Sequence, residues 1–221
     1  MHPLKNGIEA SSPIIMGYIP LGFAFGALAV MSGLSVLEAS MMSLIVYAGA
    51  SQFIAVEMIS KGADAISIAL VTFFVNLRHL LMSTSLSRYL RRVKKAEKIV
   101  LAHLITDESF SVSSILFPKD ESFRLRLLGC GISAYFSWFL GTLCGAITAS
   151  SLYLGDLGLE FALPAMFSAL LVWQFKERIN IAVAILSGAL TIALFPLLSY
   201  TALFLSPLIA SLFGVMVWRN S

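Results

Sequence analysis

The chain has 221 residues, of which 58% are hydrophobic and 12% are charged, and its mean hydropathy is +0.90. Soluble domains carry about 25% charged residues, so this composition excludes an ordinary soluble protein and indicates a polytopic membrane protein. The formal net charge is +3, and six Lys and Arg residues lie between positions 88 and 98, directly after an apolar segment. This position favours a cytoplasmic loop that obeys the positive-inside rule over a nucleic-acid-binding site.

Long uncharged segments predict the membrane-spanning helices. We expect spans within residues 13–31, 39–56, 65–87, 127–149 and 161–175. Residues 179–218 are uncharged and long enough for two spans of about 20 residues each, which we divide near Phe195-Pro196. The predicted fold class is an all-α polytopic membrane protein with six or seven transmembrane helices, in one domain over residues 1–221.

Residues 99–117 are moderately apolar but carry His103, Asp107 and Glu108. A polar-lined span, a re-entrant element and a surface helix all fit this composition. If the basic loop at 119–126 is cytoplasmic, like the loop at 88–98, the segment does not fully cross the membrane. The side of the N-terminus is also open, because residues 39–60 could form either a simple crossing or a hairpin.

A weak internal repeat suggests two structural halves. Gly33-Leu34 and a following Met-Met-Ser-Leu motif at 41–44 resemble Gly158-Leu159 and the Met-Phe-Ser-Ala motif at 166–169, at a constant offset. If the repeat is real, residues 13–87 and 124–218 form two inverted repeats with broken helices, and such repeats often enclose the substrate site of secondary transporters. Chance similarity between apolar sequences is the alternative.

The segment at 127–149 has a small residue at nearly every fourth position: Gly129, Ser133, Ser137, Gly141, Gly145 and Ala149. Small residues at this spacing allow another helix backbone to approach closely. We expect the neighbour to be a helix of the same chain or of a partner subunit.

The segment at 65–87 contains the polar residues that are most informative about function. Thr72, Asn76, His79, Ser83 and Ser87 follow helical spacing and predict one polar face. Arg78 lies beside that face, and a guanidinium in the middle of a bilayer costs about 2.5–3.5 kcal/mol on insertion scales. We therefore expect Asn76 and His79 to bind substrate in a polar cavity, and Arg78 to have a structural or coupling role.

The motif at 47–53 lies in the middle of another predicted span. Gly49 and Ser51 weaken a helix, and Gln52 supplies an amide with two donors and an acceptor. A broken helix there would free backbone groups to bind a carboxylate or an ammonium group, so Gly49, Ala50, Ser51 and Gln52 are candidate substrate-binding residues. A continuous helix with a small-residue face is the alternative.

Thr106, Asp107 and Glu108 are candidate structural or coupling residues. Either carboxylate could pair with Arg78 or carry a proton. The alternative is a solvated face of a cytoplasmic helix.

Taken in order along most of the chain, a set of motifs resembles the AzlC family, the large subunit of bacterial branched-chain amino acid exporters: residues 17–26, Ala-Gly-Ala-Ser-Gln-Phe at 48–53, Asn-Leu-Arg-His at 76–79, Thr-Asp-Glu at 106–108 and Leu-Glu-Phe-Ala-Leu-Pro-Ala at 159–165. The resemblance implies export of valine, leucine, isoleucine or a similar amino acid such as methionine. It also implies an ion gradient, for which protons are a candidate, a small AzlD-type membrane partner, and a multi-pass location in the bacterial cytoplasmic membrane.

Two other functions remain as alternatives, an intramembrane enzyme and a structural subunit that supports a partner's pore. The sequence contains neither His-Glu-x-x-His nor Gly-x-Ser-x-Gly, because Gly49-Ala50-Ser51-Gln52-Phe53 lacks the final glycine. We therefore expect a transporter without catalytic residues, metal, cofactor or nucleic-acid partner.

Overall fold

The computed structural model describes residues 2–91, 93–152, 178–198 and 202–219, together with the single positions 158, 161, 164, 165, 168, 171, 172 and 175. In this part of the chain every extended regular element is a helix, which confirms the predicted all-α membrane fold class. The chain divides into two compact units, Met1–Ala162 and Leu163–Ser221.

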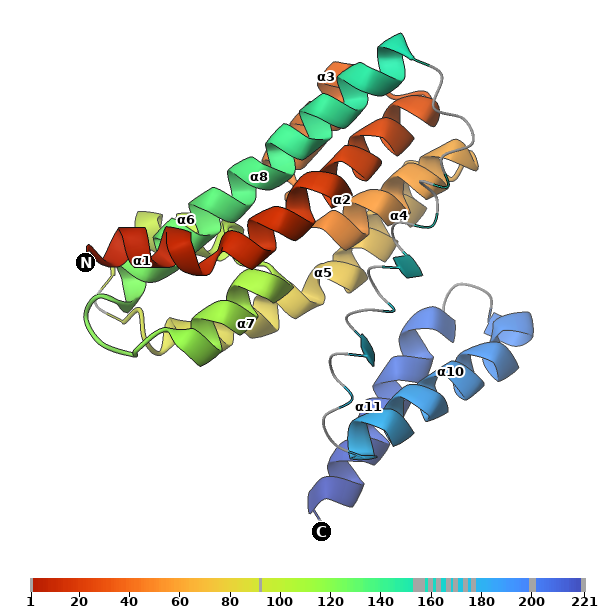
Figure 1. Cartoon of the computed structure of the whole chain (residues 1–221). Coiled ribbons are helices and arrows are strands. Elements are labelled where there is room, and N and C mark those ends of the chain that lie inside the picture. The colour runs from red at the N-terminus through yellow and green to blue at the C-terminus, as the bar shows by residue number, and fades with distance from the viewer. Residues whose placement is uncertain are drawn as a thin grey trace. The chain divides into compact units, whose positions relative to one another are not determined.

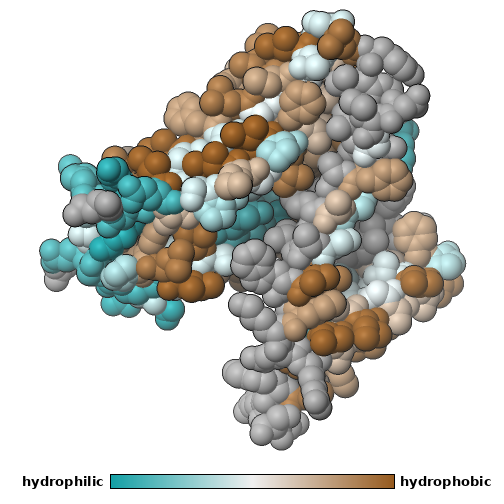
Figure 2. Space-filling view, in the orientation of Figure 1, coloured by the Kyte–Doolittle hydropathy of each residue, from teal (hydrophilic) through white to brown (hydrophobic). Residues whose placement is uncertain are grey.

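The first unit contains eight described helices in chain order: α1 (Pro3–Ala10), α2 (Ser12–Met31), α3 (Val36–Ile45), α4 (Gly49–Ser60), α5 (Ala65–Ser87), α6 (Lys95–His103), α7 (Asp107–Leu116) and α8 (Phe123–Ser151). Within this unit, α2 runs alongside α8 and also contacts α4, and α5 packs against α4 and α7 (Figure 1). Apolar residues cover much of the exposed helix surface of this unit, and hydrophilic ones gather at one end (Figure 2).

Glycines fix the contact between α2 and α8. A Cβ atom on Gly26 would overlap the carbonyl oxygen of Thr142, and one on Gly145 would overlap the carbonyl oxygen of Phe23. Nearer the start of α8, a Cβ atom on Gly129 would overlap the carbonyl oxygen of Leu4 in α1. The predicted small-residue face is thus confirmed, and its neighbours are helices of this same chain.

The predicted span at 39–56 is interrupted rather than continuous. A capping box of Ser35 and Glu38 begins α3, which ends at Ile45, and α4 begins at Gly49. Between them Tyr47 has a φ of 43°, a left-handed conformation that is unusual for a bulky side chain. The broken-helix interpretation of this motif is therefore confirmed.

Residues 99–117 also form a broken element. Helices α6 and α7 meet at an angle of 113°, as in a broken span or a re-entrant loop. Thr106 begins α7 with a second capping box, in which its Oγ1 accepts from the Ser109 backbone and the Ser109 hydroxyl accepts from the Thr106 backbone. The bend and the cap exclude a single straight helix over 99–117.

Four described helices are long and apolar enough to cross a membrane, namely α2, α5, α8 and residues Ile179–Leu198, and the bent pair makes a fifth if it is one span. The predicted helix at 65–87 has the bounds of α5. Asp64 caps it, and hydrogen bonds from the Ser67 side chain and backbone lower the pKa of the Asp64 carboxyl. About half of the predicted span at 161–175 and most of the second repeat motif lie outside the described residues.

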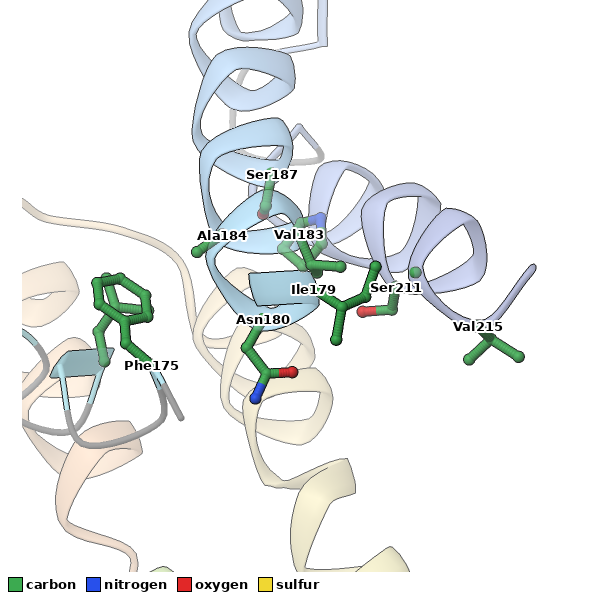
Figure 3. A pocket seen from close by; sticks show the side chains of 11 residues that line it. Phe175, Ile179, Asn180, Val183, Ala184, Ser187, Ser211 and Val215 are labelled. Carbon is green, nitrogen blue, oxygen red and sulfur yellow. The ribbon is translucent and has the colours of Figure 1, made fainter. Parts of the chain in front are cut away.

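In the second unit, α10 (Arg178–Leu198) and α11 (Ala202–Arg219) pack against each other. The residues predicted to hold two spans form two helices, and the first of them ends near the predicted division, since α10 continues through Pro196 to Leu198. Membrane helices tolerate such prolines when neighbouring groups satisfy the freed carbonyls. A cavity of about 500 Å³ lies between these helices, with Ser187 and Ser211 among mostly apolar neighbours (Figure 3).

The α2–α8 contact can be tested with matched glycine variants. Gly145→Ala should lower the stability of the folded protein by about 1–3 kcal/mol or more, because the new methyl group overlaps a backbone carbonyl. Gly17→Ala on α2 is the control, since a Cβ there meets nothing within 4 Å. The measurement is thermal stability in detergent by size-exclusion chromatography. Equal melting of both variants would contradict the packing.

Candidate functional site

The two helix breaks meet beside the polar face of α5. From this face, the Asn76 amide donates to the Ser51 hydroxyl in the first turn of α4, at 3.0 Å. One helical turn later, His79 Nδ1 lies 3.0 Å from the carbonyl oxygen of Ile105, which is in the break between α6 and α7. The predicted polar face of α5 therefore connects both irregular segments.

Side chains bind two of the backbone groups freed by the first break, the Ala48 N–H and the Leu44 carbonyl. The Ala48 N–H donates to Gln52 Oε1, and Gln52 Nε2 donates to Ser43 on α3, each at 3.1 Å. The Tyr135 hydroxyl of α8 donates to the Leu44 carbonyl at 2.7 Å. Gln52 is completely buried, and both ends of its amide have partners within the protein. These contacts make Gln52 a residue that positions the break.

The N-terminus of α4 differs from that of α7. Ala48 precedes α4 and no side chain caps it, so its first backbone N–H groups, at Gly49, Ala50 and Ser51, receive no side-chain cap. In contrast, Thr106 caps α7, and Asp107 and Glu108 occupy its first turn. An uncapped helix N-terminus is a favourable place for an anionic group.

Two buried acceptors on α5 have no donor among the described residues. Asn76 uses its amide nitrogen for Ser51, and its Oδ1 has no partner. A carbonyl oxygen can only accept, so the contact with Ile105 requires the hydrogen of His79 on Nδ1. In a neutral ring, His79 Nε2 is then an acceptor, and it too is buried without a partner.

Arg78 forms an ion pair with Asp107, with 2.6 Å between Nη1 and Oδ2. The sequence left open whether Asp107 or Glu108 pairs with Arg78, and in the structure the partner is Asp107. Glu108 has a different neighbour, because the Tyr18 hydroxyl donates to Glu108 Oε2 and also lies 2.7 Å from Thr106 Oγ1. The two adjacent carboxylates thus face a cation and a phenol respectively.

Aromatic residues around the site were not identified from the sequence. The indole of Trp138 lies against Gly49, where a Cβ would come within 2.9 Å of the ring, and Tyr18 packs edge-on against the same indole at 5.5 Å. Tyr47 contacts Tyr135 with ring centroids 4.8 Å apart. Aromatic side chains in apolar segments resemble ordinary core residues, so spacing gave no signal for them. In the described part of the chain, no three His, Cys, Asp or Glu side chains are placed to bind a metal.

The Arg78–Asp107 pair can be tested by charge and by geometry. Arg78→Leu should leave Asp107 without its cation at membrane depth and lower the amount of folded protein in the membrane. Arg78→Lys should recover only part of the yield, since an ammonium cannot reproduce the planar guanidinium contact. The measurement is membrane yield and chromatographic homogeneity. The surface variant Lys61→Leu, which removes an exposed helix pair with Glu57, is the control. Normal yield of Arg78→Leu would contradict the structural role.

Comparison with known proteins identifies a family model and several membrane proteins that this chain resembles. The AzlC protein family model matches residues 13–152. The inner membrane protein YgaZ of Escherichia coli is 35% identical, over 84% of this chain and 79% of that protein. An uncharacterized membrane protein of Archaeoglobus fulgidus is also 35% identical, over 90% of this chain and 87% of that protein.

The branched-chain amino acid transport protein AzlC of Bacillus subtilis is 26% identical, over 79% of this chain and 68% of its own length. No solved structure matches the chain. The family and these relatives support a role in membrane transport, in agreement with the apolar helices. The chain belongs to the AzlC family of membrane proteins.

Proposed function

We propose that this chain is the large subunit of a secondary transporter that exports branched-chain amino acids across the bacterial cytoplasmic membrane. The Bacillus subtilis relative, a branched-chain amino acid transport protein, supports the substrate class. The observation that carries the proposal is the pair of unpartnered acceptors, Asn76 Oδ1 and His79 Nε2, next to the uncapped start of α4.

The two parts of this site match the two charged groups of a free amino acid. Backbone N–H groups of Gly49, Ala50 and Ser51 suit the carboxylate. Asn76 and His79 offer acceptors for the ammonium group, and the Asn76–Ser51 hydrogen bond keeps the acceptors beside the donors. In an amino acid both charged groups are attached to one carbon, so adjacent donor and acceptor sets are what its recognition requires.

The remaining predicted residues receive supporting roles in this proposal. Gln52 positions the α3–α4 break, and Thr106 caps the start of α7. Arg78 and Asp107 hold α5 to the start of α7, and Glu108 is a candidate proton carrier for coupling. We also propose an AzlD-type small membrane partner, and the two inverted repeats over residues 13–87 and 124–218.

Asn76→Ala tests the substrate site. The variant should lose about 10- to 100-fold in leucine affinity, since a hydrogen bond to a charged group contributes about 1.5–3 kcal/mol. Thr72→Ala, one turn earlier on the same face, should transport normally because, within the described part of the chain, Thr72 bonds to carbonyls of its own helix. Counterflow of labelled leucine in proteoliposomes and membrane yield are the measurements.

The same assay separates the two alternatives. A purely structural subunit would allow normal counterflow from Asn76→Ala as long as the protein assembles. An enzyme would consume labelled leucine instead of accumulating it unchanged. Either result would overturn the proposed function.

A further inference from the structure

A second cavity lies at the basic end of α5, apart from the site around Asn76. Its volume is about 270 Å³, and it lies between the last turns of α5 and the start of the α6–α7 element. The lining residues that matter here are Ser83, Thr84, Ser87, Lys98, Ala102 and Ile105. Sites for drug-sized ligands measure about 300–1,000 Å³, so this volume suits one small molecule.

The cavity continues the polar face of α5. Ser83 and Ser87 follow His79 at intervals of four residues and therefore lie on the same side of the helix. Ile105 joins the two regions directly, because it lines the cavity while its carbonyl accepts the hydrogen bond from His79. Ile105 is 1% exposed and lies between the cavity and His79.

Lys98 supplies a positive charge to the cavity wall. Its ammonium group has one hydrogen bond among the described residues, a long contact of 3.5 Å to the Arg91 carbonyl. The neighbouring carboxylate, Glu97, is engaged by Arg124 at 2.6 Å and does not neutralise it. The hydroxyls of Thr84 and Ser87 donate to carbonyls of their own helix, so the groups left to bind an anionic part of a ligand are the Lys98 ammonium and the Ser83 hydroxyl.

We propose that this cavity is the cytoplasmic vestibule through which an amino acid reaches the central site, and that Lys98 binds its carboxylate there. This inference rests on the proposed function. The positive-inside rule places the loop at 88–98 on the cytoplasmic side, where an exported substrate must enter. From the vestibule, movement of Ile105 away from His79 opens the path to Asn76.

The carboxylate of a substrate and the phosphate of a lipid headgroup share the chemistry that Lys98 would recognise. Cysteine protection distinguishes them. In a background without Cys130 and Cys144, Ser87→Cys and Ala102→Cys are placed separately in the cavity wall. An impermeant thiol reagent is added to inverted membrane vesicles, whose outer face is the cytoplasmic one. Both cysteines should react, and leucine should slow the reaction at least about threefold.

Lys94→Cys is the matched control, because Lys94 is exposed in the same basic segment but does not line the cavity. It should react at a rate that leucine does not change. If leucine protects neither cavity cysteine while the vesicles still transport leucine, a lipid or another ligand occupies the cavity and the inference is wrong. If the wild-type vesicles transport no leucine, the proposed function itself fails.

Kinetics of leucine uptake into inverted vesicles, which corresponds to export, give a second measurement. Lys98→Ala should raise KM at least about threefold with kcat unchanged, and Lys98→Arg should restore KM. Lys95→Ala is the control, since Lys95 is an exposed residue of the same helix outside the cavity. An unchanged KM for Lys98→Ala, or an equal change for Lys95→Ala, would overturn the role of Lys98.

Discussion

The constraint on which the structure depends is that backbone polar groups freed inside a membrane protein must find partners. Without water in the hydrocarbon region, each unsatisfied group costs several kcal/mol, so irregular backbone survives only where protein groups or a cavity surround it. This chain interrupts two helices, at 46–48 and at 104–106, and surrounds both interruptions with side chains from α2, α5 and α8. The close contact of α2 with α8 brings these side chains near enough to do so.

Much of the architecture could be predicted because single residues carry strong local signals. The uncharged runs gave α2, α5 and α8 to within a few residues, since hydrophobic length alone determines a span. The four-residue spacing of Gly129, Gly141 and Gly145 gave the packing face of α8, because only small residues allow carbonyls to approach so closely. Gly49 and Ser51 indicated a possible break, with a continuous helix as the alternative. The cost of a guanidinium in an apolar segment indicated that Arg78 has a partner, but left Asp107 as one of several choices.

Other features depend on contacts between distant residues and leave no local pattern. The 113° bend between α6 and α7 lies at Thr106, which caps the start of α7. A threonine in a moderately apolar segment does not by itself indicate a helix cap, because the cap forms only where the chain has already turned. In the sequence, Tyr18 and Trp138 resemble ordinary core residues. In the structure, Tyr18 donates a hydrogen bond to Glu108 and Trp138 packs against Gly49. The sequence also assigned Gln52 to substrate, but the fold directs its amide to Ala48 and Ser43, because the α3–α4 break creates those partners.

Under the proposed function, the contrast between the two helix N-termini separates a part of the polar centre that holds the protein together from a part that binds substrate. Both α4 and α7 begin in the interior, and each begins with donors that favour negative charge. At α7 the protein supplies that charge itself through Asp107 and Glu108, and Arg78 fixes Asp107 in place. At α4 no side chain completes the helix, while α5 contributes acceptors from Asn76 and His79 beside it. Under the proposed function, a zwitterionic amino acid supplies both the negative charge for the start of α4 and the donors for Asn76 and His79, whereas a simple anion or cation supplies only one of them.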